Sequence, residues 1–178
     1  MKIILIGMKA CGKSTVGKLL AKELGIEFVE VDREIEKVHL VNKKEKLKFK
    51  KIFEKYGEVY FRKLESGALI KISQEKNKKN FVLACGGGTP IEENNQKILK
   101  QLGKIFFLDA NSEILLFRIL KHSVPIFFNN PEDPKKSLEE LLEKRISIYE
   151  KLADKKISFT NETPKELVGI IINNLKKL

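Results

Sequence analysis

Short apolar runs alternate with longer amphipathic stretches along this chain. The apolar runs are rich in β-branched and aromatic residues and fall at Ile3–Ile6, Ile26–Val31, Phe81–Ala84, Ile105–Leu108 and Ile157–Phe159. The stretches between them are rich in lysine and glutamate with helical periodicity, as at Ser14–Leu24 and Leu138–Leu152. Strands that are apolar on both faces and joined by helices form a parallel sheet covered on both sides. The pattern predicts a three-layer α/β fold with ligands bound beyond the carboxyl ends of its strands.

Two segments interrupt this alternation. The chain has 178 residues without an internal repeat or linker, so residues 1–178 are predicted to form one domain. Residues 38–51 are so densely charged that they indicate an exposed helix or an insertion. Residues 121–136 contain three prolines and two asparagines, which predicts a loop. Within it, Phe127 and Phe128 either anchor the loop to the core or belong to a lid that closes over substrate.

The composition excludes several classes of protein. The net charge is +11, but the lysines are spread along the chain without interleaved aromatic residues, which favours a solvated surface over nucleic-acid binding. No apolar run is long enough to span a membrane, and the apolar start is too short for a signal peptide. Cys11 and Cys85 lack disulfide or zinc-site spacing and are interpreted as reduced thiols. We therefore expect a cytoplasmic monomer that binds neither nucleic acid nor membrane.

The first apolar run leads directly into the phosphate-binding pattern G-x4-G-K-[ST], in the sequence GMKACGKST of residues 7–15. Its glycines let the backbone N–H groups point at the phosphates of ATP, and the following helix adds positive potential at the same place. Lys13 reaches the β- and γ-phosphates as a catalytic residue, and the Ser14 hydroxyl is a ligand of Mg²⁺. The predicted nucleotide-binding residues are Gly7, Ala10, Cys11, Gly12, Lys13, Ser14 and Thr15.

The ends of the next two apolar runs supply candidates for the phosphate acceptor site. Alternation places Glu30 and Asp32 on one face of the second strand, near its carboxyl end. Asp32 either assists an attacking hydroxyl or holds Mg²⁺ through water, and it could also cap a helix beginning at Arg33. The third run continues into Gly86, Gly87 and Gly88, where either a ligand lies against the backbone or the chain makes a tight turn.

Arginine is rare in this lysine-rich chain. Of 35 basic residues only four are arginine: Arg33, Arg62, Arg118 and Arg145. An arginine retained against a lysine-rich background marks a place where a planar, bidentate donor is needed.

The whole chain resembles the shikimate kinase family through GMKACGKST, VDREIE, IFEKYGEVYFRKLE, ACGGG and KRISIYEKLA, which occur in the family's order. The resemblance implies a P-loop NTPase-like domain with strand order 2-3-1-4-5, an acceptor-binding segment at about 33–65 and a lid at about 119–136. It implies ATP-dependent, Mg²⁺-assisted phosphorylation of the 3-hydroxyl of shikimate, in aromatic amino acid biosynthesis. Asp32 would contact the shikimate hydroxyls, Arg62 and Arg145 its carboxylate, and Gly87 its ring. Arg118 would pack near adenine.

Four departures from the family pattern bear on function. Ala10 replaces a glycine, which requires negative φ at that position, and Glu30 replaces an aspartate. The segment between VDREIEK and IFEKYGE is longer by about six residues. Val124 stands where the family's lid carries an arginine, with Lys121 and His122 as the nearest basic residues. Three hypotheses follow: a shikimate kinase, a kinase of another small hydroxy acid, or a nucleotide-binding paralogue with little turnover.

Overall fold

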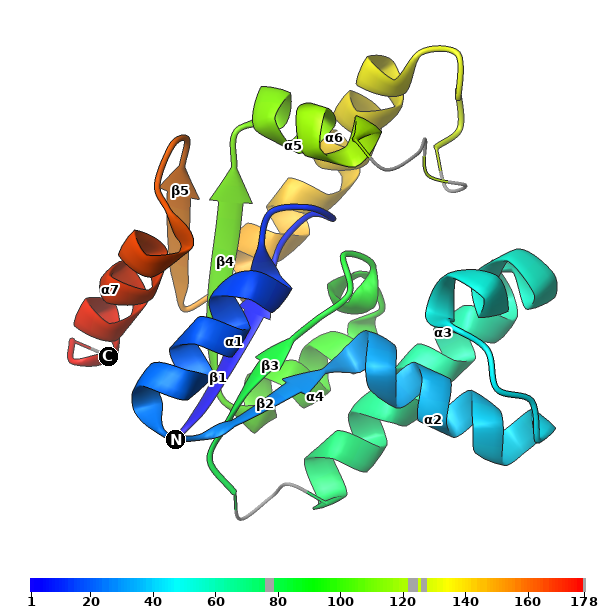
Figure 1. Ribbon diagram of the computed structural model, residues 1–178, viewed down its shortest axis with the longest axis horizontal. Coiled ribbons are helices and arrows are strands. Elements are labelled where there is room, and N and C mark those ends of the chain that lie inside the picture. The colour runs from blue at the N-terminus through cyan, green and yellow to red at the C-terminus, as the bar shows by residue number, and fades with distance from the viewer. Residues whose placement is uncertain (76–78, 122–124, 126–127, 178) are drawn as a thin grey trace.

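The computed structural model describes residues 1–75, 79–121, 125 and 128–177. Its centre is a parallel sheet of β1 (Lys2–Ile6), β2 (Glu27–Glu30), β3 (Phe81–Ala84), β4 (Lys104–Ala110) and β5 (Lys155–Phe159) in the order β2-β3-β1-β4-β5 (Figure 1). The pairs Leu5–Ala84 and Leu5–Phe106 fix the register of the three central strands. Both the predicted fold class and the predicted strand order are confirmed.

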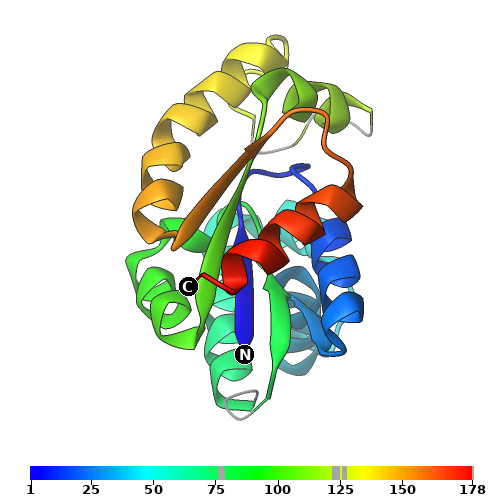
Figure 2. The ribbon, with the colours of Figure 1, turned by 90° about the vertical axis from the view of Figure 1, so that its left-hand side faces the viewer.

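Helices cover both faces of the sheet. They are α1 (Lys13–Leu24), α2 (Val31–Lys43), α3 (Phe49–Glu75), α4 (Glu93–Leu102), α5 (Ser112–Leu120), α6 (Pro134–Leu152) and α7 (Pro164–Leu175), with a short 3-10 helix, η1, at Thr89–Ile91. Viewed from the β5 side, α1 and α7 lie on one face and α4 and α6 on the other (Figure 2). The strands are apolar on both faces because both are covered, as Ile3–Ile6 illustrates with 0% exposure of every side chain.

The chain beyond β2 forms an arm at the edge of the sheet. Helix α2 packs against α3, and both lie to the side of β2 in Figure 1. Gly57 has φ 76° and ψ 175°, so it breaks α3 into two helical parts that meet at an angle. The segment predicted as an exposed helix or an insertion, residues 38–51, consists of the end of α2, an irregular connection and the start of α3.

The second strand is shorter than predicted. The strand ends at Glu30 and α2 begins at Val31, so Asp32 lies in the first turn of a helix rather than on a strand. The predicted role of Asp32 as a cap for a helix starting at Arg33 is therefore wrong, because the capping position belongs to Glu30. An apolar Val31 continues the strand pattern through the strand-to-helix corner, which is why alternation alone extended the strand too far.

Among the described residues, no helix is both long enough and apolar enough to cross a membrane. Cys11 and Cys85 are both buried free thiols.

Candidate active site

The phosphate loop links β1 to α1 at the carboxyl edge of the sheet. Gly7 has φ 141°, and a Cβ there would lie 2.5 Å from the carbonyl oxygen of Leu108 on the neighbouring strand. Gly12 has φ 102° and is the N-cap of α1, so the amide groups at the start of this helix face the loop. Between them Cys11 is buried, whereas Thr15 is exposed in the first turn of α1.

Ala10 contradicts the expectation that its backbone would keep negative φ. Its φ is 67°, in the left-handed region that costs an alanine about 1 kcal/mol or more. The Ala10 carbonyl accepts a hydrogen bond of 3.3 Å from Nη1 of Arg118 on α5. This contact places Arg118 beside the phosphate loop and helps to hold the strained residue in position.

The two polar residues that begin α1 are already engaged by the protein. The Lys13 ammonium group is buried and donates to the carbonyl oxygens of Gly7 at 2.9 Å and Met8 at 2.8 Å. The Ser14 hydroxyl donates to the Glu30 carboxylate at the end of β2. Glu30 also pairs with Arg33 at 3.3 Å, and the Arg33 side chain is otherwise 68% exposed.

Asp32 approaches the phosphate loop although it stands on a helix. Its Oδ1 lies 3.3 Å from where a Cβ on Gly86 would be, so the absence of a side chain at Gly86 admits the carboxylate. Burial, reinforced by the nearby Glu65 carboxylate and opposed by Lys13, raises the pKa of Asp32 to about 6. At neutral pH the group is ionised and is a stronger base than an ordinary aspartate.

The three successive glycines after β3 leave room for close neighbours, which are side chains at Gly86 and Gly88 and the phosphate-loop backbone at Gly87. A Cβ on Gly88 would lie only 2.2 Å from Nη1 of Arg62. A Cβ on Gly87 would lie 3.2 Å from the backbone nitrogen of Lys9 and in ordinary contact, at 3.7 Å, with Nη1 of Arg145. None of the three has positive φ, so the glycines serve close approach rather than a turn that requires them. This loop brings Asp32, Arg62 and Arg145 together from three helices.

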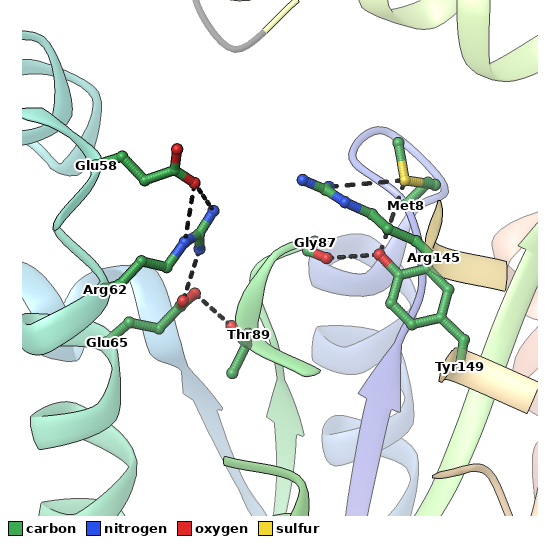
Figure 3. Close-up of polar contacts among 8 residues, drawn as sticks. All are labelled: Met8, Glu58, Arg62, Glu65, Gly87, Thr89, Arg145 and Tyr149. Atoms are coloured by element: carbon green, nitrogen blue, oxygen red, sulfur yellow. Dashed lines mark hydrogen bonds and ion pairs between the residues drawn. The ribbon is translucent and has the colours of Figure 1, made fainter. Parts of the chain in front are cut away.

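Arg62 is held from two sides by carboxylates on α3 (Figure 3). Its Nη1 donates to the buried Glu65 at 2.7 Å, while Nε and Nη2 donate to the exposed Glu58 at 3.3 and 3.2 Å. The other oxygen of Glu65 accepts from the Thr89 hydroxyl at 2.6 Å. Glu65 therefore ties the arm to the glycine loop, and it received no role in the sequence analysis.

Arg145 reaches the same space from α6 on the opposite side of the glycine loop (Figure 3). One turn further along this helix, the fully buried Tyr149 donates its hydroxyl to the Gly87 carbonyl at 2.5 Å. The sulfur of Met8 lies 3.9 Å from Nη1 of Arg145. Tyr149 was also missed, although its position four residues after Arg145 puts both side chains on one helix face.

The sequence-predicted lid is described only in part. Val124, His122 and Phe127 lie outside the described residues. Phe128 is buried against the core, which favours the anchoring alternative for this residue.

The phosphate loop lies at the carboxyl edge of a sheet ordered β2-β3-β1-β4-β5, and an aspartate and two arginines face this loop. These features together define a P-loop kinase. The family model described as "Shikimate kinase" matches residues 9–176 of this chain. The chain belongs to the shikimate kinase family.

Relatives and solved structures agree with this assignment over almost the whole chain. A shikimate kinase of Thermodesulfovibrio yellowstonii is 40% identical over 176 residues, covering 99% of this chain and 95% of the relative. A shikimate kinase from Acinetobacter baumannii in complex with shikimate is 32% identical with a TM-score of 0.87, covering 99% and 93%. The shikimate kinase from Aquifex aeolicus is 37% identical with a TM-score of 0.79, covering 99% and 96%.

The raised pKa of Asp32 predicts a pH-dependent contribution to stability. The folded protein holds this proton more tightly than the unfolded chain, whose carboxyl pKa is near 3.8. Its stabilising effect is therefore complete below about pH 4 and is lost as the pH rises through about 6. We expect the wild-type free energy of unfolding to fall by about 3 kcal/mol relative to Asp32→Asn over that range. Urea denaturation of both nucleotide-free proteins measures this, and a difference independent of pH would contradict it.

Proposed function

We propose that this protein transfers the γ-phosphoryl group of ATP to the 3-hydroxyl of shikimate. The observation that carries the proposal is the convergence of Arg62 and Arg145, from opposite sides of one glycine loop, beside Asp32. Two guanidinium groups suit a carboxylate, which each can bind with paired hydrogen bonds. A small acid held there would present its hydroxyl groups toward Asp32.

Asp32 is the group best suited to assist the attacking hydroxyl. A carboxylate with a pKa near 6 is ionised at neutral pH and can accept the proton as phosphoryl transfer proceeds. Lys13 would exchange the carbonyl oxygens of Gly7 and Met8 for phosphate oxygens of the nucleotide. The backbone N–H groups of the phosphate loop would stabilise the negative charge on the phosphates that Lys13 does not neutralise.

The residues around Ser14 fit a magnesium ion. The Ser14 hydroxyl and the Glu30 carboxylate meet at the mouth of the phosphate loop, and both are hard oxygen ligands. Mg²⁺ usually keeps several waters and binds through one or two protein oxygens together with the phosphates of the substrate. When bound, Mg²⁺ would neutralise charge that develops on the phosphates. Ser14 would be its direct ligand, and Glu30 would hold a metal-bound water.

The site favours a catalytic protein over a nucleotide-binding relative without turnover. Lys13, Asp32, Arg62 and Arg145 are all present and all face the same edge of the sheet. A coupled ADP-release assay with shikimate and a panel of other small hydroxy acids tests the proposed acceptor. If another acid were turned over faster than shikimate, that acid and not shikimate would be the preferred acceptor.

Lys13→Ala should reduce turnover by about a hundredfold or more while weakening ATP binding less. The substitution removes the charge at the β- and γ-phosphates but leaves the amide cradle. Steady-state kinetics and nucleotide titration measure the two effects. Lys22→Ala, exposed near the end of the same helix, is the control and should behave as wild type. Undiminished turnover of Lys13→Ala would exclude this loop as the catalytic phosphate site.

Arg62→Lys and Arg145→Lys should each raise the KM for shikimate by about tenfold with little change in the KM for ATP. Lysine keeps the charge but loses the planar fork that binds a carboxylate. Arg118→Lys provides the reciprocal comparison, because Arg118 contacts the phosphate loop and should affect ATP instead. If Arg62→Lys or Arg145→Lys impaired ATP binding alone, the assigned carboxylate clamp would be wrong.

Gly88→Ala should displace the Arg62 guanidinium and raise the KM for shikimate by about tenfold. The added methyl group would occupy space within 2.2 Å of Nη1 of Arg62, and that flexible side chain is the part that can move. Gly169→Ala on α7, where a Cβ meets nothing within 4 Å, is the matched control. Unchanged kinetics for Gly88→Ala would show that the close approach is not needed for acceptor binding.

A further inference from the structure

A histidine is fully buried inside the arm, between α2 and α3. The side chain of His39 on α2 is 0% exposed, and its Nδ1 lies 3.1 Å from the hydroxyl oxygen of Tyr60. Its ring centroid lies 5.2 Å from that of Tyr56 and 5.8 Å from that of Tyr60. The two tyrosine rings contact each other at 4.9 Å.

Glu45 lies next to the cluster formed by His39, Tyr56 and Tyr60. Its carboxylate accepts from the Tyr56 hydroxyl at 2.7 Å and from the Lys55 ammonium group at 2.6 Å, and these hydrogen bonds lower the pKa of Glu45. The Nε2 atom of His39 lies 3.5 Å from the same carboxylate. Glu45 belongs to the connection between α2 and α3, the segment in which this chain is longer than the family pattern.

The cluster spans the break in α3. Tyr56 precedes Gly57 and Tyr60 follows it, so His39 contacts the helix on both sides of the break. His39 lies two helical turns after Asp32 on α2, and Tyr60 lies two residues before Arg62 on α3. The cluster therefore joins the helix that carries Asp32 to the helix that carries Arg62.

We propose that His39, Glu45, Tyr56 and Tyr60 form a brace that fixes the angle at Gly57 and thereby sets the distance between Arg62 and Asp32. His39 is a positioning residue for acceptor binding, and this role rests on the proposed function of Arg62 and Asp32. A leucine could fill the volume of the imidazole ring, but it could not form the directional contact with Tyr60 that orients the second part of α3.

His39→Leu should raise the KM for shikimate by about tenfold, with kcat within about threefold of wild type and the KM for ATP unchanged. Tyr60→Phe, which removes only the hydroxyl, should also raise the KM for shikimate. His39→Asn keeps a polar group able to reach Tyr60 and should recover part of the loss. Val41→Ala, on the exposed side of the same helix, is the control. Equal loss in kcat and in both KM values would indicate general destabilisation and overturn the positioning role.

Amide hydrogen exchange tests the brace independently of the reaction. In His39→Leu, amides of residues 58–65 should exchange about tenfold faster or more, whereas those of β1 and β3 should match wild type. If the wild-type protein did not phosphorylate shikimate, the proposed function would be wrong. The exchange measurement would still test whether His39 holds the two parts of α3 in position. If His39→Leu did not fold, Tyr60→Phe would be used for both measurements. Unchanged exchange in residues 58–65 would overturn the inference.

Discussion

The proposed acceptor half of the site depends on the hydrogen bonds of the buried Glu65 carboxylate. One oxygen accepts from Arg62 and the other from Thr89, so a single group of 1% exposure joins α3 to the loop after β3. A carboxylate buried in this way must keep its partners, because an unpaired buried charge is severely destabilising. The raised pKa of Asp32 is due first to burial and second to the charge of Glu65, so the same carboxylate that holds Arg62 also adds to the basicity of Asp32.

The proposed nucleotide and acceptor halves of the site are built by different physical means. The phosphate loop depends on backbone conformation, with positive φ at Gly7, Ala10 and Gly12. The acceptor side depends on side chains from separate helices that meet over glycines without unusual dihedral angles. The first half is local in sequence, whereas the second exists only when α2, α3 and α6 are packed around the sheet.

This difference explains how much could be predicted from the sequence. Apolar runs and the phosphate-binding pattern indicated the parallel sheet and the loop, because both are encoded locally. The roles suggested for Arg62 and Arg145 came from family resemblance, since they are more than eighty residues apart and no local pattern brings them together. Glu65 and Tyr149 went unassigned because burial, which turns a common surface residue type into a structural partner, is decided by tertiary packing. Ala10 was misjudged because a non-glycine residue rarely adopts positive φ.

The hydrogen bonds of Lys13 to two loop carbonyls have a consequence for product release. In the proposed reaction, a nucleotide would compete with the carbonyl oxygens of Gly7 and Met8 for the Lys13 ammonium group, which already donates to both. Hydrogen bonds to a charged group contribute roughly 1.5–3 kcal/mol each, so the exchange offsets part of the energy gained from the phosphates. On this proposal, the loop would provide partners for the Lys13 ammonium group after ADP leaves, so release of the product would not leave a buried charge unpaired. In the proposed reaction, the loop itself would offset part of the binding energy of the nucleotide, which favours release of the product over its retention.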